Sequence, residues 1–224
     1  MADKSHKRVN DILLGPLERP ALQWLAAHMP PWMTPDILTG IGIAGAAIIF
    51  LSYWLSNIAP AFLWVASLGF VINWFGDSLD GTLARYRKIE RPQYGFFVDH
   101  TVDAFSEVLV VMGLGLSPYV TFGVACLALI GYLLMSVLIY IRTYVDGVFK
   151  ISYGKFGPTE VRVILILLNT AMFFLGSPEV DLPLGLGTVY DIPVVLIAAV
   201  LTMLFVTGSI RGAAELSKLD ERGG

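Results

Sequence analysis

Six apolar stretches divide this sequence, and each is long enough to cross a lipid bilayer as a helix. They cover residues 37–56, 60–84, 94–116, 119–145, 160–177 and 191–213. A bilayer core of ~30 Å requires about 20 consecutive apolar residues in an α-helix. Hydrophobic residues make up 56% of the chain and charged residues only 15%, which leaves too little polar surface for a soluble domain. We therefore predict an all-α membrane protein with six transmembrane helices.

The basic residues predict how these helices are oriented. All 15 lysines and arginines precede the first stretch, separate the second from the third, flank the connection of the fourth to the fifth, or follow the core of the sixth. The intervening connections, near Asn57, Ser117 and residues 177–190, contain none. Six spans place every basic residue on one side, and the positive-inside rule makes that side cytoplasmic. Both termini are then predicted to be cytoplasmic, in a cell or inner membrane.

The sequence before the first span has a different character and forms a first segment, residues 1–33. Within residues 8–29, apolar side chains recur at helical spacing, whereas Gly15, Pro16 and Pro20 interrupt the pattern. We predict a short amphipathic helix, or a pair of helices, along the cytoplasmic membrane interface. The apolar positions are Val9, Ile12, Leu13, Leu17, Ala21, Trp24 and Leu25. No secretory signal peptide is expected in this segment.

Thr34 and Pro35 are suited to the N-cap and the first position of the first span. A six-helix domain is expected over residues 34–216, followed by a polar tail at 217–224. The single cysteine, Cys126, excludes an internal disulfide and a cysteine-rich metal site.

Four aspartates interrupt two consecutive apolar stretches, where ionisable residues are costly and indicate function. Asp77 and Asp80 are three residues apart, and Asp99 and Asp103 are four apart, so each pair shares one helix face. A short connection makes the two helices antiparallel, which should bring all four carboxylates together. Oxygen ligands suit Mg²⁺, Mn²⁺ or Ca²⁺. The alternative is a structural cluster paired with the arginines of residues 85–91.

Small residues and an arginine accompany these aspartates. Gly81, Ala84 and Gly95 lie on or beside the same faces, where they would let a flat group approach the helix backbone. Ordinary helix–helix packing explains them equally well. The Arg85 guanidinium suits phosphate oxygens, or it anchors the helix at the interface. Together with a divalent ion, these residues suggest a site for a nucleotide diphosphate.

The same residues closely resemble the signature of the CDP-alcohol phosphotransferase family, D-x2-D-G-x2-A-R followed by G-x3-D-x3-D. All eight fixed positions are present: Asp77, Asp80, Gly81, Ala84, Arg85, Gly95, Asp99 and Asp103. The gap between Arg85 and Gly95 holds nine residues, one more than expected, and the extra residue falls in a polar turn that tolerates insertion.

The resemblance implies an enzyme that transfers a substituted phosphate group from a CDP-linked alcohol to a second hydroxyl and releases CMP. It implies two ions, Mg²⁺ or Mn²⁺, held by Asp77, Asp80 and Asp99, with Asp103 as a further ligand and as the general base. Gly81, Ala84 and Gly95 would lie close to the cytidine, and Arg85 would contact a donor phosphate. A homodimer in a membrane is implied, and no nucleic-acid partner is expected.

A second basic set follows the fourth stretch. Arg142, Lys155 and Arg162 would bind a phosphate on the acceptor, or they only anchor the helices on the positive side. Our first hypothesis takes CDP-diacylglycerol as donor and a small polar alcohol as acceptor. The alternative is a CDP-choline or CDP-ethanolamine donor with a diacylglycerol-like acceptor. A more remote alternative is a divalent-cation transporter.

Three further features stay open at this stage. His100 follows Asp99 directly, and it is either catalytic or merely a polar helix residue. Glu107 lies one turn beyond Asp103 and either supports the site or bonds to another helix. The small residues GIGIAGAA at 40–47 pack either within the chain or across a dimer.

Overall fold

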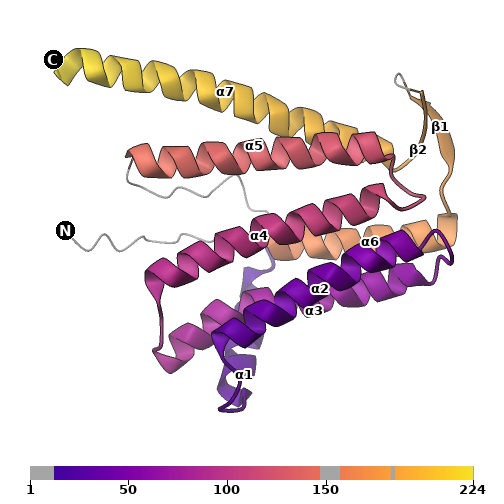
Figure 1. The fold of residues 1–224 in the computed structure, drawn as a ribbon, viewed down its shortest axis with the longest axis horizontal. Helices are drawn as coiled ribbons and strands as arrows, with labels where there is room; N and C mark the ends of the chain where they lie inside the picture. Colours follow the sequence, from indigo (N-terminus) through magenta and orange to yellow (C-terminus); the bar gives the residue numbers. More distant parts are fainter. Residues whose placement is uncertain (1–12, 147–156, 183–184, 224) are drawn as a thin grey trace.

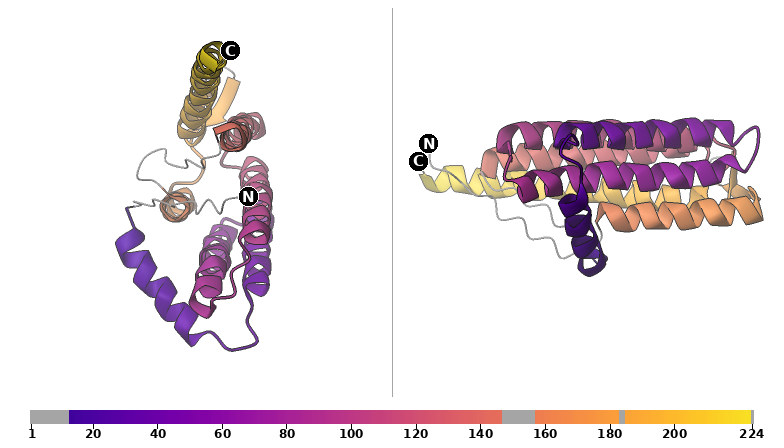
Figure 2. Two further views of the ribbon diagram at one scale, coloured as in Figure 1. Left: turned by 90° about the vertical axis from the view of Figure 1, so that its left-hand side faces the viewer. Right: turned by 90° about the horizontal axis from the view of Figure 1, so that it is seen from below.

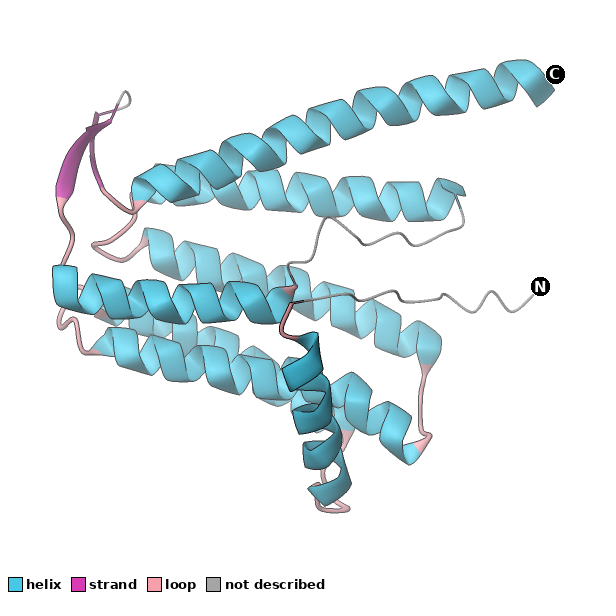
Figure 3. Ribbon diagram, turned by 180° about the vertical axis from the view of Figure 1, so that it is seen from behind, coloured by secondary structure: helices cyan, strands magenta, loops and turns pink. Residues whose placement is uncertain are grey.

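A computed structural model of the chain describes residues 13–146, 157–182 and 185–223. Within these ranges it contains seven helices and one two-stranded antiparallel sheet (Figures 1 and 3). The elements are α1 (Gly15–His28), α2 (Pro35–Leu55), α3 (Phe62–Arg87), α4 (Pro92–Gly115), α5 (Phe122–Asp146), α6 (Pro158–Leu175), β1 (Glu179–Leu182), β2 (Gly185–Thr188) and α7 (Asp191–Gly223). Each predicted apolar stretch corresponds to one of the helices α2 to α7. Helix α7 continues through residues 217–223, where we expected a polar tail.

Helices α2 to α7 run side by side, and the described connections between consecutive helices lie at the two ends of the bundle (Figure 1). The α3–α4 connection and the last turns of α7 lie at one end, and the β1–β2 hairpin lies at the other. Helix α1 runs across the bundle instead of along it (Figure 2). This is the arrangement expected for an amphipathic helix that lies along a membrane interface.

Five helices of the described chain are long and apolar enough to cross a membrane, namely α2, α3, α5, α6 and α7. They make the chain an integral membrane protein. Helix α4 has 24 residues but is not among the five, because Asp99, Asp103 and Glu107 lie along it. The count of six spans, which includes α4, stays a prediction.

The described residues confirm the all-α fold, and they add one short hairpin before α7 that we had not predicted. Strands β1 and β2 pair in antiparallel register, with Glu179 opposite Thr188 and Leu182 opposite Gly185. Residues 179–182 alternate acidic and apolar side chains, which is the period of a strand. This alternation is the signal in the sequence that we overlooked.

Helices α2 and α3 are in backbone contact, and glycines make that contact possible. A Cβ atom on Gly45 would lie 2.5 Å from the backbone nitrogen of Asn73, and one on Gly76 would lie 2.7 Å from the Cα of Gly42. Either methyl group would force the helices apart. Gly42 and Gly45 belong to the small-residue run 40–47, so these two pack within the chain. The contact fixes the backbone immediately before Asp77.

Helix α1 has two apolar faces. Leu22 and Ala26 are buried in a cluster with Leu79 and Leu83 of α3. Leu13, Leu17 and Trp24 of the predicted apolar stripe are largely exposed instead, whereas Leu25 packs against the cluster; Val9 and Ile12 lie outside the described residues. The outer stripe is therefore available for lipid, while the inner face attaches the helix to α3.

Candidate active site

Helices α3 and α4 bring three of the four predicted aspartates together. Carboxylate oxygens of Asp77, Asp99 and Asp103 all lie within 4.8 Å of one another. We call these three residues the carboxylate group. Asp77 comes from the C-terminal half of α3 and the other two from the N-terminal half of α4, as the short α3–α4 connection requires.

Asp80 does not belong to this group. Its Oδ2 accepts a hydrogen bond of 2.6 Å from the hydroxyl of Thr39 on α2. Thr39 also donates to the carbonyl of Pro35, 3.1 Å away. We had not predicted a role for Thr39, although it ends the TPDILT sequence that opens the first span.

Arg162 lies beside the carboxylate group. Its Nη2 is 2.6 Å from Asp77 Oδ2, and its Nε donates to Asn73 Oδ1 at 2.9 Å. The Arg162 side chain is only 14% exposed, and its buried Nη1 has no hydrogen-bond partner among the described residues. Asn73 in turn donates to the carbonyl of Gly42 at 2.9 Å. Asn73 was missed in the sequence, where its position one turn before Asp77 is the available signal.

The carboxylate group fits a hard divalent cation. It offers oxygen donors only, from two helices held in a fixed relation, and such donors suit Mg²⁺ or Mn²⁺. Three neighbouring carboxylates repel one another, and the single guanidinium of Arg162 cannot balance all three. A bound cation would supply the remaining positive charge.

The small residues beside the aspartates have room next to them. Apart from its chain neighbours and the nearby backbone of its own helix, no described atom lies within 4 Å of the position that a Cβ on Gly95 would take. Under the same condition, the three atoms nearest to a Cβ on Gly81 all belong to the Arg85 guanidinium, whose Nη1 is 3.3 Å away. Ala84 is partly buried in the same turn of α3. Arg85 itself is exposed and donates to the Thr82 hydroxyl at 3.2 Å. Tight helix packing among the described residues therefore does not account for these two glycines.

The basic residues predicted to bind the acceptor substrate, Arg142, Lys155 and Arg162, do not form one cluster among the described residues. Arg162 lies at the carboxylate group, whereas Arg142 of α5 donates to Glu215 Oε2 of α7 at 3.0 Å. Lys155 lies outside the described residues. The two described arginines of the set thus pair with different helices.

His100 and Glu107 extend the polar face of α4. The His100 ring packs on Phe96 at 4.1 Å between centroids and meets Tyr140 of α5 edge-on at 5.6 Å. Its Nδ1 lies 2.8 Å from the Phe96 carbonyl oxygen. Glu107 is close enough to Arg162 for their charges to interact. Tyr140 was not anticipated from the sequence.

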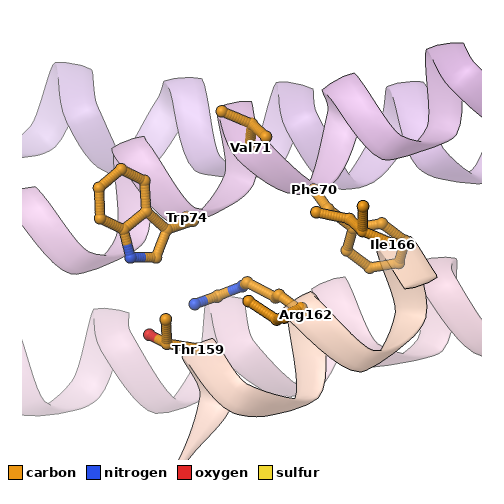
Figure 4. A pocket seen from close by; sticks show the side chains of 7 residues that line it. Phe70, Val71, Trp74, Thr159, Arg162 and Ile166 are labelled. Atoms are coloured by element: carbon orange, nitrogen blue, oxygen red, sulfur yellow. The ribbon is translucent and has the colours of Figure 1, made fainter. Parts of the chain in front are cut away.

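A pocket of about 170 Å³ opens between α3 and α6, next to Arg162 (Figure 4). Its walls are mostly apolar, with Arg162 and Thr159 as the polar contributions from α6. Figure 4 shows Trp74 of α3 facing these two residues across the pocket. The lining residues are Phe70, Val71, Trp74, Thr159, Arg162, Val163 and Ile166.

Known proteins share both the sequence pattern and the fold. Cholinephosphotransferase 1 of Gallus gallus is 28% identical over 214 residues, which is 90% of this chain and 59% of that protein. The chain spans about half the length of the cholinephosphotransferases it matches. A phosphatidylinositol phosphate synthase of Cutibacterium acnes is 36% identical over 93 residues, 41% of this chain and 40% of the other.

The crystal structure of Mycobacterium tuberculosis phosphatidylinositol phosphate synthase with CDP-DAG bound has the same fold. The TM-score is 0.57 at 20% identity, over 84% of this chain and 89% of the other. The model of the CDP-alcohol phosphatidyltransferase family matches residues 32–209, which include every residue of the carboxylate group and Arg162. The chain therefore belongs to the CDP-alcohol phosphatidyltransferase family.

Proposed function

We propose that this protein transfers a substituted phosphate group from a CDP-linked alcohol to the hydroxyl of a second alcohol and releases CMP. The observation that carries the proposal is the convergence of Asp77, Asp99 and Asp103 within 4.8 Å. These residues belong to the eight-position motif of a family whose members are named for this transfer. The open space beside Gly81 and Gly95 supports a nucleotide next to the carboxylate group.

Asp103 acts as the general base in this proposal. Its carboxylate takes the proton of the acceptor hydroxyl, whose oxygen then attacks the phosphorus atom that carries the donor alcohol. The bond from this phosphorus to the bridging oxygen breaks, and CMP leaves with that oxygen. Two divalent ions, Mg²⁺ or Mn²⁺, would be held by Asp77, Asp80, Asp99 and Asp103 and would neutralise the charge that develops on CMP.

The other motif residues bind and orient the donor. Gly81, Ala84 and Gly95 lie against the cytidine, and the exposed Arg85 guanidinium contacts a donor phosphate. Thr39 holds Asp80 in place through its 2.6 Å hydrogen bond. Arg162 keeps Asp77 oriented and, with Arg142 and Lys155 as further candidates, offers positive charge to an anionic acceptor.

The proposal also includes the membrane arrangement. Six spans, with α4 among them, place the carboxylate group near the cytoplasmic side together with both termini. A lipid substrate then keeps its acyl chains in the bilayer while its head group reacts. We propose a homodimer on the basis of the family resemblance.

CDP-diacylglycerol is the donor that we favour, with a small polar alcohol as acceptor. The fold neighbour was solved with CDP-DAG bound and matches most of this chain. The long match to cholinephosphotransferases favours the second candidate, a CDP-aminoalcohol donor with a diacylglycerol-like acceptor. The two candidates differ in which substrate is the lipid.

Release of CMP by the purified full chain in lipid nanodiscs, with Mg²⁺ or Mn²⁺, tests the proposal. CDP-diacylglycerol is paired with inositol phosphate, glycerol phosphate, serine or inositol, and CDP-choline and CDP-ethanolamine are paired with diacylglycerol. We expect metal-dependent release with one of the pairs. Removal of the general base in Asp103→Asn should reduce the rate by about a hundredfold or more.

Glu179→Ala, an exposed change on β1, is the matched control and should retain the wild-type rate. Metal-dependent ion uptake into proteoliposomes, without CMP release from any pair, would contradict the proposal and favour the transporter.

A further inference from the structure

Glu18 of α1 joins α3 to α6 through a single oxygen atom. Its Oε1 accepts a hydrogen bond of 2.8 Å from the indole Nε1 of Trp74 and one of 2.7 Å from the hydroxyl of Thr159. Trp74 belongs to α3 and Thr159 to the first turn of α6. A side chain of the crossing helix therefore connects two bundle helices that are 85 residues apart in sequence at this point.

The two donors lie one turn away from an ion pair of the carboxylate group. Trp74 precedes Asp77 by three residues, and Thr159 precedes Arg162 by three. Residues three apart on a helix share a face, so the Glu18 bridge and the Asp77–Arg162 pair lie next to each other. The Glu18 bridge and the 2.6 Å contact between Arg162 and Asp77 thus join the same two helices, one turn apart.

Side-chain packing does not set the separation of α3 and α6 by itself. The pocket beside Arg162 lies between α3 and α6, and Trp74 and Thr159 are part of its lining (Figure 4). Further along the two helices, Asn169 of α6 donates to the Ser67 hydroxyl of α3 at 3.1 Å, and Met172 and Ile166 of α6 pack in one core cluster with Phe70 of α3. Beside the pocket, the Glu18 bridge adds a polar connection to these contacts.

Both ends of α1 are themselves attached, so Glu18 is presented from a fixed helix. At the start, Glu160 Oε1 of α6 accepts a hydrogen bond of 2.7 Å from the backbone N–H of Leu14. After the helix ends, the guanidinium of Arg87 donates to the carbonyls of Met29, at 3.0 Å, and Met33, at 2.6 Å. Arg87 is the last residue of α3, so α1 is held to both helices that its Glu18 connects.

We infer that Glu18 is a positioning residue, which fixes α3 against α6 beside the pocket and so keeps Arg162 against Asp77 in the carboxylate group. This inference rests on the proposed function for its effect on catalysis. Glu18 touches neither reacting group, and it acts through Trp74 and Thr159.

Three variants of the full-length protein test the inference. Glu18→Ala removes the bridge, whereas Glu18→Gln keeps a carbonyl oxygen that can accept both hydrogen bonds. Thr159→Val removes the hydrogen bond from Thr159 to Glu18 and leaves Glu18 and its bond to Trp74 in place. Because a misplacement of about 1 Å can reduce a rate 10²-fold, we expect Glu18→Ala to lower CMP release roughly tenfold or more per folded protein. Thr159→Val should lower the rate by a smaller factor, and Glu18→Gln should stay close to wild type.

Two measurements report on the bridge without turnover. In a ¹⁵N-indole NMR spectrum of the five tryptophans, assigned with Trp74→Phe, Glu18→Ala should shift the Trp74 signal and Glu18→Gln should shift it less. Binding of Mn²⁺ followed by EPR should weaken several-fold in Glu18→Ala, because supporting residues tune metal affinity by 10–100-fold. Glu179→Ala should change neither measurement.

A Trp74 signal and a Mn²⁺ affinity that are both unchanged in Glu18→Ala would overturn the inference. An equal loss of CMP release and Mn²⁺ affinity in Glu18→Gln and Glu18→Ala would also overturn it. The oxygen that accepts the two hydrogen bonds would then not be what positions Arg162. A wild-type protein that releases no CMP, while Glu18→Ala still alters the indole signal and Mn²⁺ binding, would refute the proposed function but leave the bridge supported.

Discussion

Asp191 and the carboxylate group lie toward opposite ends of the helix bundle, and the negative charges of their carboxylates are stabilised in different ways. Asp191, at the start of α7, is fully buried. Its Oδ1 accepts a hydrogen bond of 2.7 Å from the N–H of Thr121, and its Oδ2 accepts from the hydroxyl of Thr121 at 2.7 Å and the N–H of Thr188 at 2.8 Å. The oxygens of the carboxylate group instead face one another within 4.8 Å.

The difference teaches how to separate a structural aspartate from a functional one in the same membrane protein. Hydrogen-bond donors around Asp191 tie the β1–β2 hairpin and the start of α5 to α7, and they leave no need for a cation. In the carboxylate group, Arg162 pairs with Asp77, and three carboxylates lie within 4.8 Å of one another, so their combined negative charge attracts a cation. Burial alone would have ranked Asp191 as the stronger candidate site.

Removal of the Asp191 carboxylate is expected to have the largest effect on stability. Asp191→Ala removes a fully buried acceptor and leaves the donors of Thr121 and Thr188 without it, which should cost about 3 kcal/mol in the free energy of unfolding. Thermal or SDS-induced unfolding followed by circular dichroism measures the loss. Glu179→Ala, on the exposed side of the same hairpin, should leave stability unchanged. A severe loss of CMP release per folded protein in Asp191→Ala would contradict the proposal that Asp191 is structural and that only the carboxylate group is functional.

The two ends of α4 offer a second test with one glycine each. A Cβ on Gly113 would lie 2.8 Å from the Cα of Phe50, whereas a Cβ on Gly95 would meet no described atom within 4 Å apart from its chain neighbours and the nearby backbone of its own helix. Gly113→Ala should therefore destabilise the fold by about 1–2 kcal/mol, because overpacking outweighs the gain in helix propensity. Gly95→Ala should leave the fold unchanged or slightly more stable and raise the KM for the CDP donor. Equal stability changes in the two variants would contradict this contrast.

Thr39 allows a finer test within the carboxylate end itself. Thr39→Val removes the hydroxyl that donates to Asp80, and Thr39→Ser retains it. Because outer partners of metal ligands typically change affinity by 10–100-fold, we expect about tenfold weaker Mn²⁺ binding in Thr39→Val and little change in Thr39→Ser. Isothermal titration of Mn²⁺ measures both. An unchanged affinity in Thr39→Val would remove Asp80 from the proposed metal site.

The sequence predicted those parts of the molecule that depend on local pattern. Apolar length predicted the positions of α2 to α7, and Thr34 and Pro35 predicted the start of α2. The spacings of the aspartates predicted that all four would meet, and three of them do, whereas Asp80 bonds to Thr39. The Thr34 hydroxyl does accept the Ile37 N–H, at 3.2 Å. The membership of the family was also evident from the eight fixed positions of the motif.

Contacts between distant helices could not be predicted in the same way. No spacing rule relates Arg162 to Asp77, or Glu18 to Trp74 and Thr159, because these pairs depend on how α1 and α6 lie against α3. The hairpin was missed because four residues of alternation are a weak signal inside an acidic connection. The exposure of Trp24 followed from α1 using Leu22 and Ala26 for its contact with α3.

Binding of Mn²⁺ to the wild type, Asp99→Asn and Asp191→Asn, followed by EPR in nanodiscs, tests the central claim most directly. The claim is that the carboxylate group, and not Asp191, is the functional acidic site. The account predicts that the wild type binds Mn²⁺, that Asp99→Asn binds it at least tenfold more weakly, as expected for the loss of a ligand, and that Asp191→Asn binds it as the wild type does. Equal binding by the wild type and Asp99→Asn, or an equal loss in both variants, would contradict it.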